Sequence, residues 1–460
     1  MNADTTIRGG DVVLEGAAVR ADIAITDGVI TAITRDSVDA RTVVDATGCL
    51  VLPGGVDAHV HLSGGGGPEG ATTWVDDWES GSRAAVAGGV TTVGNMTVPR
   101  VGESLPDVVR RVGADAAAQS LVDVLLHPVV TGEDHLDPGQ LTALRELGQT
   151  SIKVFTVIEA FSHHRQRFYE FMAEAGRQGF LTLVHCEDGE LIGYCTTHLT
   201  REGRADFRAY GESRPHTSEE AAVAQVVAFA ETSGTPVYVV HLSSARALDV
   251  CAAARARGVP VYVETRPLYL HLTSERFAEP DAGKYVGAPP LREASDREAL
   301  WAGLAAGDVD TVCSDHAPWT LEAKLDPALN AVTARQGVAD LETLMPMLYS
   351  EGVLAGRISL DQFVALTSAN AARIFGLYPR KGAIAVGSDA DIALWDPGHH
   401  RTIDGARMQS LSGYSVYDGW QVQGWPAFVL RRGDLVLADG ELTARPGTGE
   451  WLPRTTRPWR

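Results

Sequence analysis

The stretch GGVDAHVHLSGGGG, residues 54–67, places two histidines two positions apart in a short apolar run and then continues in glycines. Alternate side chains of a β-strand point to the same face, so His59 and His61 can direct both imidazoles at one ion. Imidazole and carboxylate groups suit a borderline divalent metal such as Zn²⁺. The glycines leave room for a substrate above such an ion. The stretch therefore predicts a buried strand whose carboxyl end carries a metal site.

Outward from this stretch, similar apolar runs alternate with segments in which apolar residues recur at spacings of three and four, as in amphipathic helices. The strand-like runs cover residues 50–62, 90–96, 121–130, 151–155, 181–187, 236–244, 259–267 and 309–318. Eight near-continuous apolar strands that alternate with helices predict an α/β fold, a (β/α)8 TIM-like barrel, because barrel strands are buried on both faces. A doubly wound open sheet is the alternative, but no GxGxxG motif follows the first strand.

The two ends of the chain differ from its middle and resemble each other. Both contain short alternating strands broken by Gly or Asp-Gly, and a hairpin is expected to turn at Arg432-Gly433. We predict that residues 1–50 and 380–460 together form a small β-sandwich domain. Residues 51–379 then form the barrel.

Polar residues stand at the carboxyl ends of the predicted barrel strands, where a plain core would have Val or Leu. In a barrel, these ends line the active face. A lone buried histidine is usually a hydrogen-bonded core residue, but four of them with a Lys and an Asp indicate a functional site. The candidates are His59, His61, Lys153, His185, His241 and Asp315. Seven other histidines are expected on the surface or in loops: His127, His135, His198, His216, His271, His399 and His400.

Lys153 is the unusual member of this group, because the apolar run SIKVF offers its ammonium no water. One interpretation is a buried pair with a carboxylate. The other is that the neutral amine has captured CO2, since the resulting carbamate is an anionic ligand that can bridge two metal ions. The chain has only four lysines among 39 basic residues, and Lys284, Lys324 and Lys381 are interpreted as chance survivors.

Composition excludes several classes of protein. A net charge of -20 disfavours binding to nucleic acid. Five scattered cysteines without a CxxC spacing favour a reducing compartment, so a cytoplasmic location is expected. The N-terminal residues show no basic segment followed by an apolar one, and no run reaches about 18 apolar residues. We therefore expect neither a signal peptide nor a membrane span.

Six segments, in this order, resemble the cyclic amidohydrolases, the hydantoinases and dihydropyrimidinases with allantoinases and dihydroorotases as cousins: GGVDAHVHL, SIKVF, LVHCED, VVHLSS, APPLRE and CSDHAP. The similarity continues through residues 368–397 and 422–442 and so covers nearly the whole chain. The resemblance implies two divalent ions in each subunit of a homotetramer, zinc being the first choice. It implies that carboxylated Lys153 bridges them, with His59, His61 and Asp315 on one ion and His185 and His241 on the other.

The activity that this resemblance implies is hydrolysis of the amide bond in a small cyclic amide or imide, such as a hydantoin or a dihydropyrimidine. A hydroxide that bridges the metals attacks the ring carbonyl, and Asp315 moves the proton to the leaving nitrogen as base and then acid. The resemblance places Ala288, Gln336 and Gly337 in contact with the ring.

Several positions depart from the family pattern, so the identity of the substrate ring stays unassigned. Ile158 stands where hydantoinases carry a tyrosine that donates to the oxyanion, with His163 or His164 as candidate replacements, and Ala288 stands where they carry a serine. Ser63 replaces the arginine expected of a dihydroorotase. Allantoinases also lack the tyrosine, so allantoinase-type ring opening is an alternative. Hydrolysis of another cyclic or an acyclic amide, and a non-enzymatic tetrameric scaffold, are the others.

Overall fold

The computed structural model describes residues 3–14, 17–62 and 74–455. Eight parallel strands follow one another along the chain: β6 (Gly55–Val60), β7 (Val90–Thr97), β8 (Asp123–Pro128), β9 (Ser151–Phe155), β10 (Leu181–His185), β11 (Val237–Val239), β12 (Val261–Thr265) and β13 (Thr311–Val312). Parallel bridges between Val129 and Lys153 and between Val60 and His316 join the two groups of strands into a ring. The predicted barrel is confirmed, and each predicted run overlaps one of its strands.

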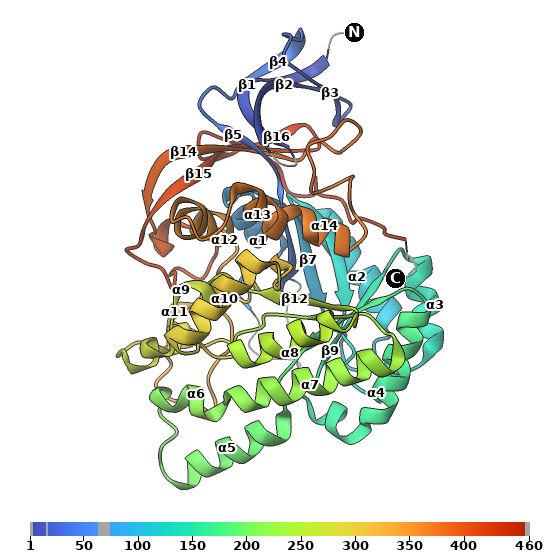
Figure 1. The fold of residues 1–460 in the computed structure, drawn as a ribbon, viewed down its shortest axis with the longest axis vertical. Helices are drawn as coiled ribbons and strands as arrows, with labels where there is room; N and C mark the ends of the chain where they lie inside the picture. Colours follow the sequence, from blue (N-terminus) through green and yellow to red (C-terminus); the bar gives the residue numbers. More distant parts are fainter. Residues whose placement is uncertain (1–2, 15–16, 63–73, 456–460) are drawn as a thin grey trace.

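Helices surround this barrel (Figure 1). The longer ones are α1 (Trp78–Ala87), α2 (Leu105–Gln119), α3 (Pro138–Glu146), α4 (Glu159–Arg177), α5 (Gly189–Arg201), α7 (His216–Ser233), α8 (Ala245–Ala256) and α10 (Ala294–Ala306). Shorter ones are α6 (Tyr210–Ser213), α9 (Pro267–His271), α11 (Leu321–Lys324), α12 (Leu344–Leu348), α13 (Leu360–Val364) and α14 (Asn370–Ile374). Asp77 caps α1 and Ser244 caps α8, each by accepting from a backbone N–H of the first turn.

Strands from both ends of the chain form one separate sheet, seen at the top of Figure 1. Its members are β1 (Ala3–Leu14), β2 (Ala17–Thr26), β3 (Val29–Thr34), β4 (Ala40–Asp45), β5 (Leu50–Pro53), β14 (Ile392–Thr402), β15 (Gln421–Arg431), β16 (Asp434–Ala438) and β17 (Glu441–Leu442). Antiparallel pairing of β5 with β14 joins the two ends. The sheet is not antiparallel throughout, because β1 pairs parallel with β4 and β5.

The hairpin expected at Arg432-Gly433 connects β15 to β16, and both turn residues have positive φ, 45° and 76°. The segment after β17 turns back to the barrel. The N–H of Val124 donates to the carbonyl of Glu450, and the N–H of Leu452 donates to the carbonyl of Val124, both at 2.8 Å. This part of the C-terminal region therefore lies against β8, while the domain division at 50/51 and 379/380 stays a prediction.

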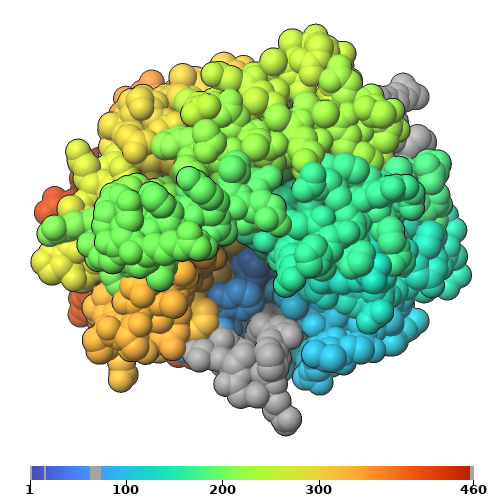
Figure 2. All heavy atoms as spheres, turned by 90° about the horizontal axis from the view of Figure 1, so that it is seen from below, coloured from blue at the N-terminus to red at the C-terminus, as the bar shows by residue number. Residues whose placement is uncertain are grey.

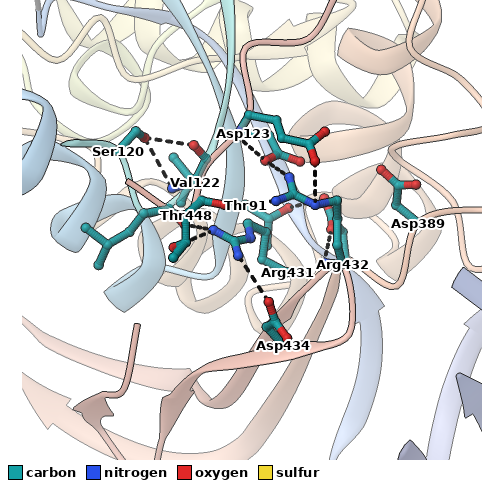
Figure 3. A network of polar contacts seen from close by, with 12 residues as sticks. Thr91, Ser120, Val122, Asp123, Asp389, Arg431, Arg432, Asp434 and Thr448 are labelled. Atoms are coloured by element: carbon teal, nitrogen blue, oxygen red, sulfur yellow. Dashed lines mark hydrogen bonds and ion pairs between the residues drawn. The ribbon is translucent and has the colours of Figure 1, made fainter. Parts of the chain in front are cut away.

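Buried charges connect the sheet to the barrel. The Nζ of Lys381 lies 2.5 Å from the carboxylate of Asp123 on β8, 2.7 Å from Asp391 and 2.9 Å from Asp389. Arg432 also pairs with Asp123, and Figure 3 shows the two side chains facing each other. Since Lys381 is 1% exposed, its interpretation as a chance survivor is wrong. It is a cation shared by three carboxylates whose charge burial would otherwise penalise more strongly.

Among the residues described here, no helix has the length and apolar character that crossing a membrane requires.

Candidate active site

The predicted site residues lie at the carboxyl ends of the barrel strands, away from the separate sheet. Figure 2 views this end of the molecule, where a hollow opens onto a floor in the blue of the chain near β6. His59 and His61 come from the end of β6, and Asp315 follows β13. These elements are neighbours because closure of the barrel brings its first and last strands together.

The two imidazoles of the opening stretch converge on one carboxylate. Oδ1 of Asp315 lies 3.2 Å from Nε2 of His59 and 3.1 Å from Nε2 of His61. Burial lowers the pKa of His61 to about 4, so this ring is neutral at pH 7, as a metal ligand must be. One donor atom from each residue lies within 4.8 Å of the other two. Such spacing lets all three surround one ion with bonds of about 2.0–2.2 Å.

His185 and His241 form a second pair beside the first. Nδ1 of His185 lies 2.9 Å from Nε2 of His241, and the ring of His241 is 5.5 Å from that of His59. The other nitrogen of His185, Nε2, bonds to the carboxylate of Glu187 at 2.9 Å. Arg214 in turn donates to Glu187. This chain of contacts leaves Nδ1 of His185 as the nitrogen that faces His241.

Lys153 is completely buried on β9, and its Nζ has no hydrogen-bond partner among the described residues. The aromatic ring of Phe155 lies 4.7 Å from it. Burial lowers the pKa of Lys153 to about 8, and the charges of Glu264 and Asp315 oppose this decrease. No carboxylate in the described part of the chain pairs with it directly, so the interpretation as a buried ion pair is wrong. An amine with a lowered pKa and no partner is suited to reaction with CO2.

Glu264 organises two of these histidines, although the sequence analysis did not single it out. Its Oε1 accepts from Nδ1–H of His59 and from the backbone N–H of His241, both at 2.8 Å, and its Oε2 accepts from the hydroxyl of Tyr238 at 2.9 Å. A carboxylate only accepts, so the proton of His59 is on Nδ1 and the lone pair of Nε2 faces Asp315. Glu264 is the last residue but one of β12, so a search for polar residues near the end of that strand, as at the others, would have found it.

Backbone strain coincides with this group of residues. Asp315 has φ 49° and His241 has φ 39°, in the left-handed region that side chains other than glycine rarely adopt. The other non-glycine residues of positive φ in the described ranges, Asp27, Arg432 and Asp439, lie in turns between strands. Strain of this kind persists where the surroundings enforce it, which is typical of functional sites.

The predicted substrate contacts lie on two segments that Lys324 holds together. The Nζ of Lys324 donates to the carbonyls of Val286, Arg335 and Gly337 at 2.6, 2.7 and 2.9 Å. Ala288 continues the first segment, and Gln336 belongs to the second. The interpretation of this buried lysine as a chance survivor is therefore wrong.

Gly337 also lies against the segment that carries Asp315. It has φ 116°, and a Cβ at this position would come within 2.3 Å of the carbonyl oxygen of Ala317. The position therefore requires glycine. The predicted contacts Gln336 and Gly337 thus belong to a segment that packs directly behind the end of β13.

The candidate replacements for the missing tyrosine lie elsewhere. The side chain of His163 is 62% exposed and lies 3.8 Å from Glu159, and Nδ1 of His164 pairs with Glu133 at 3.0 Å. Neither is joined to the site. Ile158 precedes α4 and packs against the main core. Ser63 lies outside the described residues.

Two of the histidines expected on the surface or in loops lie buried in regular elements instead, namely His127 and His271, whereas His135 is in the loop between β8 and α3 but is also buried. His127 is the nearest to the site, on β8, where its Nδ1 bonds to the hydroxyl of Ser151 at 2.7 Å. A barrel strand is apolar on both faces, so the sequence around a histidine does not show whether its side chain is buried.

Comparisons with known proteins agree with this geometry. A model of the Amidohydrolase family matches residues 50–436. The D-hydantoinase of Geobacillus stearothermophilus is 35% identical over 454 residues, 97% of this chain and 96% of that protein. The structure of D-hydantoinase (dihydropyrimidinase) from Thermus sp. has 34% identity and a TM-score of 0.94 over 99% of this chain and all of that one. Dihydropyrimidinase from Brevibacillus agri has 35% identity and a TM-score of 0.93 over 98% of this chain and 99% of that one.

Proposed function

Because this chain belongs to the amidohydrolase family, whose members bind divalent metal, we propose that it opens a hydantoin or dihydropyrimidine ring by hydrolysis. The chain is a metal-dependent hydrolase of carbon–nitrogen bonds in cyclic amides. The observation that carries the proposal is the convergence of His59, His61 and Asp315 at the closure of the barrel. The names of the relatives do not favour the allantoinase alternative, and they also speak against an acyclic substrate or an inactive scaffold.

The residues present fit a pair of divalent ions. Nζ of Lys153 is buried without a hydrogen-bond partner among the described residues, and Nε2 of His61 and Nδ1 of His185 approach only other potential ligands, Asp315 and His241. Buried polar atoms are normally hydrogen-bonded, so an unpaired amine beside converging ligand atoms indicates a missing ligand. In our proposal His59, His61 and Asp315 hold one ion, His185 and His241 hold the other, and carboxylated Lys153 bridges them. Two histidines and a carboxylate for each ion are a donor set typical of zinc.

Divalent ions bound here would supply an acidified water molecule and a polarised carbonyl. The protein contributes the proton transfers and the orientation. Asp315 accepts the proton of the attacking water and returns it to the ring nitrogen that leaves. Glu264 keeps the Nε2 lone pair of His59 directed at the ion. The backbone at Ala288 and Gly337 holds the ring by hydrogen bonds, which need no serine hydroxyl.

Three finer features are part of the same proposal. The subunits assemble as a homotetramer, the protein acts in the cytoplasm, and the chain divides into the barrel and the small domain at the boundaries predicted above. Analytical ultracentrifugation of the metal-loaded protein tests the first of these.

The test of the function is ring opening followed by mass spectrometry. Protein loaded with zinc or manganese in bicarbonate is offered hydantoin, 5-substituted hydantoins, dihydrouracil, allantoin, dihydroorotate and glutarimide. We expect a gain of one water on a hydantoin or on dihydrouracil, its loss in Asp315→Asn, and its retention in the exposed control Asp107→Asn. Opening of allantoin alone would contradict the proposed ring, and opening of no ring would contradict the proposed function.

A further inference from the structure

Arg266 follows β12 and directs its buried guanidinium at Asp315. Its Nη1 donates to Oδ2 of Asp315 at 2.8 Å, and its Nη2 lies 3.5 Å from the backbone carbonyl oxygen of the same residue. The side chain is 0% exposed, and its Nε has no partner in the described structure. Every hydrogen bond that this guanidinium makes to described residues therefore goes to one residue. Burying a cation is unfavourable, so a single dedicated partner needs a reason.

Because of this contact, the two carboxylate oxygens of Asp315 have different partners. Oδ1 faces Nε2 of His59 and of His61, whereas Oδ2 is held by Arg266. Arg266 fixes the plane of the carboxylate, because one oxygen stays on the guanidinium while the other faces the histidines.

We propose that Arg266 is a positioning residue that fixes the carboxylate of Asp315 for metal binding and proton transfer. The inference rests on the proposed function. The proton of the attacking water passes to Oδ2, which keeps a second lone pair beside the one that Arg266 occupies. From Oδ2 the proton passes to the leaving ring nitrogen, so Asp315 ends as the carboxylate from which it started. Arg266 keeps its own protons throughout, since arginine is not deprotonated in proteins.

The alternative is that Arg266 is an ordinary buried arginine that stabilises the fold. The chain offers a matched control for this in Arg431, which is 2% exposed and whose Nε has no partner among the residues that the structure describes. Arg431 donates to the carbonyl of Leu121 at 2.7 Å and to the hydroxyl of Thr448 at 2.9 Å, at the junction of the sheet and the barrel shown in Figure 3. Removal of either guanidinium disturbs a buried polar contact, but only Arg266 touches a proposed metal ligand.

The test compares Arg266→Met, Arg266→Lys and Arg431→Met as full-length, metal-loaded proteins. The readouts are kcat and KM for the ring that the wild type opens, metal content, and the visible spectrum of the cobalt-substituted protein. A misplaced acid–base group lowers kcat, so we expect Arg266→Met to lose about 10²-fold in kcat with KM and metal content little changed. Arg266→Lys should recover part of this loss. The cobalt bands should shift in Arg266→Met and stay unchanged in Arg431→Met.

The cobalt spectrum keeps the inference separate from the proposed function. If the wild type opens no ring, the proposed function fails, and a spectral shift specific to Arg266→Met still supports positioning of Asp315. A kcat and a cobalt spectrum in Arg266→Met that match those of Arg431→Met would overturn the proposal. If Arg266→Met does not fold, Arg266→Lys provides the test. We expect this variant to show shifted cobalt bands and a lower kcat than the wild type. A wild-type cobalt spectrum together with a wild-type kcat would refute the positioning role.

Discussion

Replacement of Lys153 by methionine should stabilise the metal-free protein while it abolishes metal binding and ring opening. Burial lowers the pKa of Lys153 from 10.5 to about 8. At about 1.4 kcal/mol for each pH unit, this difference of 2.5 (10.5 − 8) disfavours the folded, protonated state by about 3 kcal/mol. Methionine has a similar length and no charge, so it removes this penalty.

The direction of the pH dependence follows from the lowered pKa. The penalty is present in full below about pH 8, where the folded protein carries the charged amine, and it disappears as the pH rises to 10.5, the value of the free side chain. Metal-free Lys153→Met should therefore exceed the wild type by about 3 kcal/mol at pH 7 and by much less at pH 10. In metal-loaded protein the order reverses, since ligand binding stabilises the wild type alone.

Urea denaturation of chelator-treated protein, followed by tryptophan fluorescence at pH 7 and pH 10, measures this difference. Lys284→Met is the matched control, because Lys284 is paired with Asp281 at 2.6 Å near the surface and its loss should change little. A lower stability of metal-free Lys153→Met at pH 7 would refute the reasoning about the buried amine. Wild-type metal content and ring opening in the variant would refute the assignment of Lys153 as a ligand.

Three further substitutions have expected outcomes. Burial raises the pKa of Glu342 from 4.5 to about 7, so Glu342→Gln should raise the free energy of unfolding by about 3 kcal/mol at pH 8 and by under about 1 kcal/mol at pH 5, measured by urea denaturation. Lys381→Met removes the cation that three buried carboxylates share and leaves Asp391 without a charged partner among the described residues, so it should lower the stability by about 3–5 kcal/mol, measured by the same method. Lys324→Met releases the carbonyls of Val286 and Gly337 and should raise KM about tenfold, with kcat and metal content nearly unchanged in steady-state assays.

Each of these has a clear contrary result. If Glu342→Gln changed the free energy of unfolding equally at pH 5 and pH 8, the raised pKa of Glu342 in the folded protein would be contradicted. If the stability of Lys381→Met were within about 1 kcal/mol of the wild type, the ion pairs of Lys381 would not stabilise the fold. A Lys324→Met variant with reduced kcat and unchanged KM would show that the two segments do not hold the ring.

The strands and the barrel were predictable because the evidence for them is local. Each apolar run between residues 50 and 318 is buried on both faces, so its composition reveals it without knowledge of its neighbours. The candidate site was accessible for a related reason. His59 and His61 share a strand, and the closure of any such barrel brings the end of β6 next to the residue after β13, where Asp315 stands.

The charged contacts around the site were not predictable in the same way. Glu264 bonds to His59 across 205 positions of the sequence, and Arg266 bonds to Asp315 across 49. Lys324 and Lys381 were interpreted as chance survivors because their partners lie on other elements. Asp389 and Asp391 lie close to Lys381 in the sequence, but no local pattern shows that the chain turns back to place them on its amine.

By itself, the sequence determined the class of the fold and which side chains stand at the active end of the strands, since apolar periodicity and strand ends are properties of short segments. Only the folded chain shows which nitrogen of His59 is free, how the carboxylate of Asp315 is oriented between Arg266 and the histidines, and that Nζ of Lys153 has no hydrogen-bond partner among the described residues. These features depend on distances of about 3 Å between groups on different strands, and such distances exist only once the barrel has closed.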